Sequence, residues 1–215
     1  MIKLCIGYIL LLCAQVPVAV FSISTFFANP LGLSGVSLVA PYGLLALIYS
    51  LAVLGLGCKL IADSFLIYKA HNVQDCLRCL MVLKYGMIPY FIVNFLWLSL
   101  WAFILLIATR GTVLVVAPIL LLTAMFFTWL VLLPGGFYGL QVVRLTKKEG
   151  NLSKLGCLVH GILQFCFFLD VLDCAYLVAW KWKCGKLAAI LVCLFYCVGV
   201  VLAFFAFTRF SASLS

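Results

Sequence analysis

The sequence predicts an all-α, polytopic transmembrane helical bundle of about six spans, which forms a single integral membrane domain over residues 1–215. Hydrophobic residues make up 68% of the chain and charged residues 9%, and the mean hydropathy is +1.34. A soluble domain carries roughly 25% charged residues, so this composition cannot build a water-soluble surface. The apolar residues also fall into runs of the length that crosses a bilayer. These runs cover residues 4–27, 36–57, 87–108, 112–133, 155–180 and 187–207.

The first run, residues 4–27, follows Lys3 and has an apolar stretch longer than the roughly 7–15 residues of a signal peptide's hydrophobic region. We therefore expect an uncleaved first span with a kink at Pro17. The second run, residues 36–57, follows an uncharged, turn-rich connection of the kind that favours the outer side of a membrane. Its small residues either permit close helix packing or simply tolerate a kinked helix.

The longest polar region, residues 59–85, mixes charged residues with apolar residues at helical spacing. We expect helices that extend beyond the bilayer or lie at its surface, broken around His71 and Asn72. The third run, residues 87–108, follows directly and carries one polar side chain, Asn94, well inside it. This run is expected to cross the bilayer as one helix.

The fourth run, residues 112–133, is expected to end at Pro134-Gly135-Gly136, because proline removes a helix hydrogen-bond donor and glycine favours a turn. The basic residues of segment 137–154 then predict a cytoplasmic loop. The last run, residues 187–207, follows a lysine-rich connection and ends before Arg209. It is expected to be the final span.

The fifth run, residues 155–180, decides the topology, because it is long and apolar yet three lysines follow it. If it crosses, both termini and both basic regions share the cytoplasmic side, with ten Lys and Arg residues there and four opposite. If it does not cross, the division is twelve against two, which fits the positive-inside rule better. Its length and apolarity favour crossing. We expect six spans with cytoplasmic termini, and the alternative is five spans plus one re-entrant or interfacial helix.

The fifth run also carries polar residues that the other apolar runs lack. Asp170 and Asp173 are three residues apart, and His160 and Gln164 are four apart. On one continuous helix each pair shares a face, and the two faces lie roughly 80–180° apart. Intramembrane carboxylates are costly unless they are hydrated, paired or protonated, so these four residues are a candidate ion or proton pathway. Alternatively, the aspartates are solvated near the interface or cap a kinked helix.

The chain has eleven cysteines, most of which lie inside apolar runs. There they are expected to serve as small packing residues, because disulfide frameworks belong to short secreted chains. Cys76 and Cys79 form a lone CxxC pattern, a candidate thiol pair that coincidence in a cysteine-rich chain also explains. A zinc site needs two more ligands that the sequence does not point to, so we expect neither a metal nor another cofactor.

No common catalytic motif is present: the sequence lacks GxGD, HExxH, GxSxG and a Walker loop. We therefore expect no enzyme activity. The net charge of +9 is interpreted as topological rather than as a sign of nucleic acid, since the basic residues flank apolar runs. The expected partners are the lipid bilayer and a second copy or another membrane protein. Three functions remain open: an accessory or interaction subunit, a small transporter or ion-conducting subunit, and a membrane thiol redox protein.

Two segments carry a resemblance to known families. They are AQVPVAVFSISTFFANPLGL, residues 14–33, and GILQFCFFLDVLDCAYL, residues 161–177. The chain resembles small multi-span bacterial membrane proteins of uncharacterised families, which pair a QIPLA-like N-terminal span with a late helix of the LQ…LD type. The resemblance implies a bacterial plasma membrane protein and implies no activity.

Overall fold

The computed structural model describes residues 1–14 and 35–214 of the chain. Within these ranges every regular element is a helix, which confirms the all-α prediction. Three helical segments are long and apolar enough to cross a membrane: Leu47–Lys69, Val73–Ala108 and Ala117–Lys148. The first predicted span is described only as α1 (Ile2–Cys13), and its remainder, with Pro17, lies outside the described residues.

Helix α3 (Gly35–Lys69) is longer than the second predicted span, because the helical spacing of the polar region continues to Lys69. The chain then reverses at His71, whose φ of 53° ends the helix. Asn72 caps the next helix by accepting a hydrogen bond from the main-chain N–H of Asp75 at 3.2 Å. The predicted break around His71 and Asn72 is therefore confirmed.

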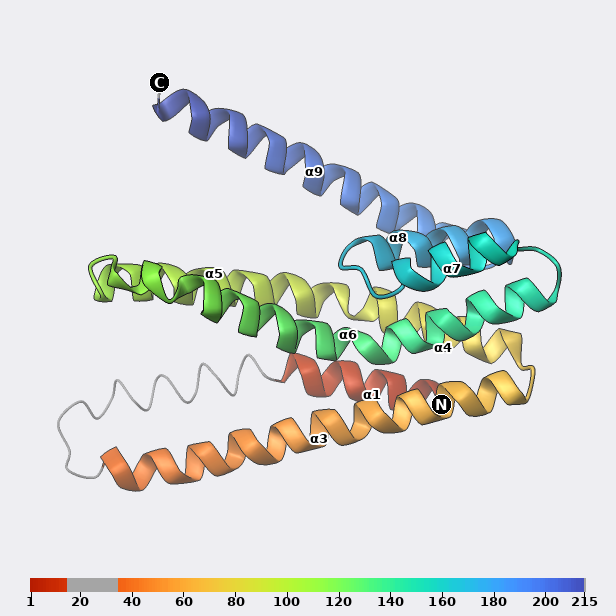
Figure 1. Ribbon diagram of the computed structural model, residues 1–215, viewed down its shortest axis with the longest axis horizontal. Coiled ribbons are helices and arrows are strands. Elements are labelled where there is room, and N and C mark those ends of the chain that lie inside the picture. The colour runs from red at the N-terminus through yellow and green to blue at the C-terminus, as the bar shows by residue number, and fades with distance from the viewer. Residues whose placement is uncertain (15–34, 215) are drawn as a thin grey trace.

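Helices α4 (Val73–Gly86) and α5 (Ile88–Ala108) follow one another almost in line, and α5 matches the third predicted span (Figure 1). Pro89 stands in the first turn of α5, where its missing N–H leaves no helical bond unmade. A short helix, η1 (Thr112–Val115), then turns the chain into α6 (Ala117–Lys148), which packs against α3 and α4.

The prediction that a helix ends at Pro134-Gly135-Gly136 is wrong, because α6 continues through this motif to Lys148. Residues 137–148, expected to be loop, are therefore helical. The glycines allow close packing rather than a turn. A Cβ on Gly135 would lie 3.3 Å from the Lys84 side chain, and one on Gly136 would lie 2.7 Å from the Phe165 ring. Neighbouring elements occupy the space that side chains would need.

The single helix expected over residues 155–180 does not form. Instead, α7 (Lys154–Leu163) and α8 (Leu169–Tyr176) fold back on each other, and the π-helical turn η2 (Leu177–Lys181) extends α8 (Figure 1). We call residues 154–181 the hairpin. It leads into α9 (Lys186–Leu214), which runs away from the rest of the bundle.

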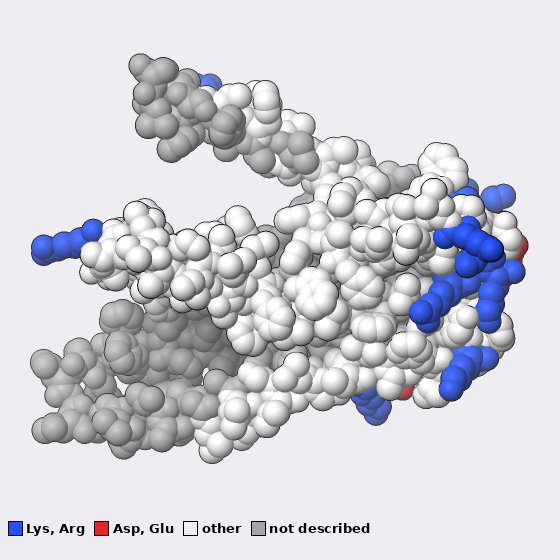
Figure 2. All heavy atoms as spheres, in the orientation of Figure 1, with Lys and Arg blue, Asp and Glu red and all other residues white. Residues whose placement is uncertain are grey.

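The buried core lies at the end of the molecule where the hairpin packs. Its fully buried side chains come from α1, α3, α4, α6 and α8, and include Tyr8, Leu60, Leu80, Tyr138, Val142 and Cys174. Most of the Lys and Arg side chains visible in Figure 2 gather at this same end. The lysine-rich connection after the hairpin lies there too, since the indole N–H of Trp182 donates to the hydroxyl of Thr146, near the basic end of α6, at 2.8 Å.

Candidate functional site: a buried polar cluster in the hairpin

The hairpin brings together all four polar residues that the sequence singled out. The Nδ1–H of His160, on α7, donates to Oδ1 of Asp173 on α8. The side-chain amide of Gln164 donates to Oδ2 of the same carboxylate at 2.5 Å. The expectation that the two pairs face different directions is wrong, because it assumed one continuous helix. The reversal after Gln164 turns α8 so that Asp173 meets the polar face of α7.

Lys84, in the last turn of α4, completes the cluster. Its Nζ lies 2.5 Å from Oδ2 of Asp170 and donates to the main-chain carbonyl of Gln164 at 3.1 Å. Sequence reasoning missed this residue, because it counted Lys84 among the basic residues at a membrane boundary. The sequence around it gave no signal, because other lysines flank apolar runs in the same way; in the structure its side chain is buried together with those of Leu80 and Leu83. We call these residues, with His160, Gln164, Asp170 and Asp173, the polar cluster.

Glycines on α6 make room for the polar cluster. A Cβ on Gly139 would lie 2.0 Å from Oε1 of Gln164, and a Cβ on Gly136 would lie 3.2 Å from the main-chain oxygen of the same residue. Any side chain at Gly139 would therefore displace Gln164 from its position against Asp173. Gly136 and Gly139 thus form the part of α6 that receives the hairpin.

The reversal of the hairpin is held by main-chain hydrogen bonds and one indole. Phe168 has a φ of 65°, which is unfavourable for a residue with a side chain. The N–H of Trp129 on α6 donates to the carbonyl of Phe165 at 3.1 Å, so this carbonyl is satisfied although it lies outside a helix. The N–H of Asp170 donates to the carbonyl of Cys166 at 3.0 Å and starts α8. These contacts fix where α8 begins.

The charges of the polar cluster balance only when it holds one extra proton. Asp170 is 1% exposed and Asp173 6%, and a buried charge is costly unless it is paired. Lys84 neutralises Asp170. Asp173 is neutralised when the His160 ring carries a second proton. With His160 neutral and both carboxyls ionised, the cluster carries one net negative charge.

His160 connects the polar cluster to the protein surface. Its side chain is 19% exposed, whereas the carboxylate it contacts is almost fully buried. The imidazole ring stacks on Tyr176 with 5.5 Å between the ring centroids and 6° between the planes. Tyr176 in turn stacks on Trp180, a largely exposed side chain near the base of the hairpin. Aromatic rings thus cover one face of the imidazole and leave part of it accessible.

The candidate thiol pair lies in the core, away from the hairpin surface. Cys76 and Cys79 are both free and fully buried, and the thiol of Cys76 points to the main-chain carbonyl of Tyr138 at 3.8 Å. Cys79 belongs to the same buried core cluster as Cys5 of α1. Over residues 1–14 and 35–214, no group of three or more His, Cys, Asp or Glu side chains is arranged to hold a metal ion.

Comparison with known proteins places the chain in one family. No curated protein matches it, and no solved structure matches it. A family model described as a family of unknown function, DUF6652, matches residues 3–183, a stretch that includes α1, the core helices and the whole hairpin. This agrees with the resemblance to uncharacterised families noted in the sequence. The chain belongs to the family of unknown function DUF6652.

Proposed function

We propose that this protein is a small multi-pass protein of the bacterial plasma membrane that transports protons, with the polar cluster as its proton-handling site. One observation carries the proposal: a broken helix joins two carboxylates and a histidine to a lysine of α4 in a single network. Ionisable residues within membrane segments are costly, and in transport proteins they mark ion paths. Discontinuous helices are the elements on which membrane transporters build such sites.

The proposal includes a topology of five spans plus a re-entrant hairpin. Trp129, which bonds the hairpin tip, lies 12 residues into the 32-residue α6, or about 18 Å at 1.5 Å per residue. A bilayer core is about 30 Å thick, so this depth puts the tip near its middle when α6 crosses. The lysines that follow the hairpin then join the other basic residues on the cytoplasmic side, as the twelve-to-two charge division favours.

The contacts within the polar cluster favour a proton over a metal cation. Oxygen atoms of carboxylates and carbonyls are the ligands of hard cations. Here each carboxylate contact is made by a nitrogen donor: Lys84 to Asp170, and both His160 and Gln164 to Asp173. These nitrogens occupy the positions that a cation would need. The net charge of the cluster changes with a single proton, which supports proton binding.

In this proposal the proton enters at His160, the accessible end of the polar cluster, and passes to Asp173. His160 takes up a proton at Nε2 from the accessible side and releases the proton on Nδ1 to Asp173. Asp170 lies closer to the hairpin tip than Asp173, one turn earlier on α8. The Lys84–Asp170 pair therefore lies deeper than Asp173, and Gln164 positions both by donating to Asp173 with its side chain and accepting from Lys84 with its main-chain carbonyl.

Proton flux through the full-length protein tests the proposal. The protein is reconstituted in vesicles that contain a pH-sensitive dye, and a potassium gradient with valinomycin supplies the driving force. We expect flux to fall to the level of protein-free vesicles in Asp173→Asn and His160→Gln, because each removes a proton-carrying group. Lys186→Gln is the matched control, since it removes an exposed charge at the same end and touches no cluster residue. Normal flux in both cluster variants would overturn the proposal.

A second candidate function, an accessory or interaction subunit, rests on α9. This helix packs against α8 and η2 near its start. Further along it exposes large apolar side chains on several faces, among them Ile190, Leu194, Phe195, Val198 and Phe204. In a membrane such a helix is free to pack against a partner helix. Absence of flux in the unaltered protein, together with a defined oligomer in detergent that Leu194→Ala disrupts, favours this function.

The third hypothesis, a membrane thiol redox protein, gains no support from the geometry. Reactive thiols are accessible, whereas Cys76 and Cys79 are fully buried. Proton transport is therefore the function that the described residues support best.

A further inference from the structure

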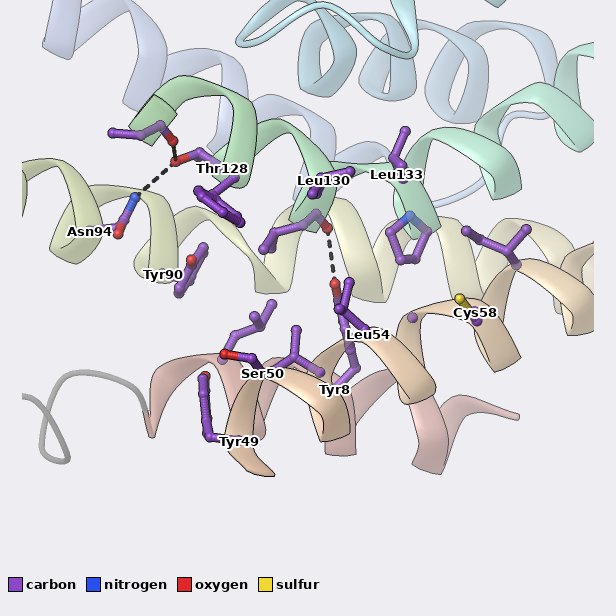
Figure 3. Close-up of a pocket in the computed structure, with 18 of the residues that line it drawn as sticks. Tyr8, Tyr49, Ser50, Leu54, Cys58, Tyr90, Asn94, Thr128, Leu130 and Leu133 are labelled. Atoms are coloured by element: carbon purple, nitrogen blue, oxygen red, sulfur yellow. Dashed lines mark hydrogen bonds between the residues drawn. The ribbon is translucent and has the colours of Figure 1, made fainter. Parts of the chain in front are cut away.

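A second feature, separate from the polar cluster, is a cavity of about 450 Å³ between α1, α3, α5 and α6 (Figure 3). This volume lies within the range of roughly 300–1,000 Å³ that small-molecule sites occupy. Pro134 and Gly57 line one part of the cavity, and Tyr49 and Asn94 line another. None of its lining residues belongs to the hairpin, so its occupant and the proton site are independent questions.

The cavity opens onto an apolar surface. Leu54, Leu98 and Phe127 line it, yet each of these side chains is also at least 39% exposed. No Lys, Arg, His, Asp or Glu is among the described lining residues. A molecule that reaches the cavity past these side chains must itself be apolar over most of its length. A charged head group would be left unpaired inside it, which is costly.

Three hydroxyls that line the cavity already donate their hydrogen to main-chain carbonyls. The hydroxyl of Tyr8 donates to the Val131 carbonyl at 3.2 Å, a bond drawn in Figure 3. The hydroxyl of Tyr49 donates to the Leu11 carbonyl at 2.8 Å. A third hydroxyl, that of Thr128, donates to the main-chain carbonyl of Ala124 at 2.8 Å and accepts from the side-chain amide of Asn94 at 3.4 Å, which leaves one lone pair. A hydroxyl has one hydrogen and two lone pairs, so each of these groups has used its hydrogen and still offers an acceptor.

Pro134 leaves one further acceptor at the cavity, the main-chain carbonyl of Leu130. It has no N–H to donate to the carbonyl of Leu130, four residues earlier, and both residues line the cavity. A ligand that donates a hydrogen bond therefore finds several acceptors in the cavity.

We propose that this cavity binds an uncharged lipid whose head group is a hydroxyl, that is, a long-chain lipid alcohol. Its hydroxyl donates to an acceptor such as Thr128 or Tyr49, and its hydrocarbon chain lies along the apolar lining and leaves past Leu54 and Phe127. A hydrocarbon without a hydroxyl lacks this bond. A fatty acid anion carries a charge and finds no cation among the lining residues described here.

Competitive photolabelling of the full-length protein in phosphatidylcholine vesicles tests the proposal. The probe is a long-chain alcohol that carries a photoreactive diazirine, and the unlabelled competitors are hexadecanol, hexadecane and hexadecanoate. We expect labelled peptides from α3, α5 and α6, and competition by hexadecanol at a concentration about tenfold lower than by the other two, the factor that one hydrogen bond supplies. Equal competition by all three, or labelling confined to other helices, would overturn the proposal.

Two variants locate the site. Val53→Trp places a large ring in the cavity and is expected to reduce labelling about tenfold or more. Leu47→Trp is the matched control, because Leu47 is an exposed residue on the same helix that does not line the cavity. Thr128→Val keeps the side-chain shape and removes an acceptor, so the preference for hexadecanol over hexadecane should shrink. Unchanged labelling in Val53→Trp, or an unchanged preference in Thr128→Val, counts against the site.

Discussion

At the scale of single residues, the polar cluster joins side chains that no local pattern connects. His160 and Asp173 are 13 residues apart, and Lys84 and Asp170 are 86 apart. The sequence could identify the four polar residues of the fifth apolar run, because charges are rare in such a setting. It could not identify Lys84 as their partner, because the many other lysines flank apolar runs in the same way. Only the packing of α4 against α8 separates this lysine from those at the surface.

Removal of one member of the Lys84–Asp170 pair should destabilise the protein strongly. Lys84→Met leaves a buried, unpaired carboxylate, a change that typically costs about 3–5 kcal/mol. The double variant Lys84→Met, Asp170→Leu removes both charges and should recover most of the lost stability. Thermal unfolding in detergent measures both effects. Lys186→Met, at an exposed position, serves as the control and should leave the midpoint unchanged. A double variant no more stable than the single variant would contradict this account of the pair.

Close packing at Gly139 gives a second residue-scale prediction. In Gly139→Ala the new Cβ would lie 2.0 Å from Oε1 of Gln164, so the Gln164 side chain must leave its position against Asp173. We expect a loss of about 1–3 kcal/mol, the usual cost of overpacking, together with reduced proton flux.

Gly55→Ala on α3 is the matched control for Gly139→Ala, because its Cβ meets nothing within 4 Å. Alanine favours a helix over glycine by up to about 1 kcal/mol, so this control should raise the unfolding temperature slightly. Equal effects of the two substitutions would show that helix propensity, rather than contact with Gln164, governs both positions.

At the scale of elements, the sequence predicted the helices better than their interruptions. Apolar length identified α5 and α9, and the polar residues around His71 identified the reversal between α3 and α4. The strongest breaker motif, Pro134-Gly135-Gly136, lies inside a continuous helix. The reversal of the hairpin, in contrast, falls at Gln164–Phe168, which contains neither proline nor glycine. Local propensity predicted neither the continuous helix at the first place nor the reversal at the second. At both places the packing of Gly136 and Gly139 of α6 against the hairpin is involved.

The energetics of the polar cluster explain why the fifth run reverses. A continuous helix would place its two polar pairs on different faces, and each carboxylate would then need a separate partner. The reversal joins Asp173 to His160 and Gln164, and turns Asp170 toward Lys84. These contacts offset the unfavourable backbone of Phe168, which costs of order 1–3 kcal/mol. Tertiary pairing therefore outweighs the helix propensity of this segment.

At the scale of the whole molecule, the hairpin changes the relation between the chain termini. Six spans would return both termini to one side, whereas a hairpin that enters and leaves on the same side leaves an odd number of crossings. In the structure α1 begins toward the end where the basic residues gather, and α9 runs from that end to the opposite one. The positive-inside rule favours the same odd number, because it gives a charge division of twelve against two rather than ten against four.

Reporters of membrane sidedness test this topology in intact cells. Fusions after Ser153 and after Cys184 bracket the hairpin, and we expect both to report the cytoplasmic side. A fusion after Ser215 should report the opposite side, because α9 crosses once more. The physical reason is the contact of Trp182 with Thr146, which holds the two ends of the hairpin beside the same basic end of α6. Opposite sides for the first two fusions would restore the six-span topology, and would place His160 and Asp173 on a helix that crosses the bilayer.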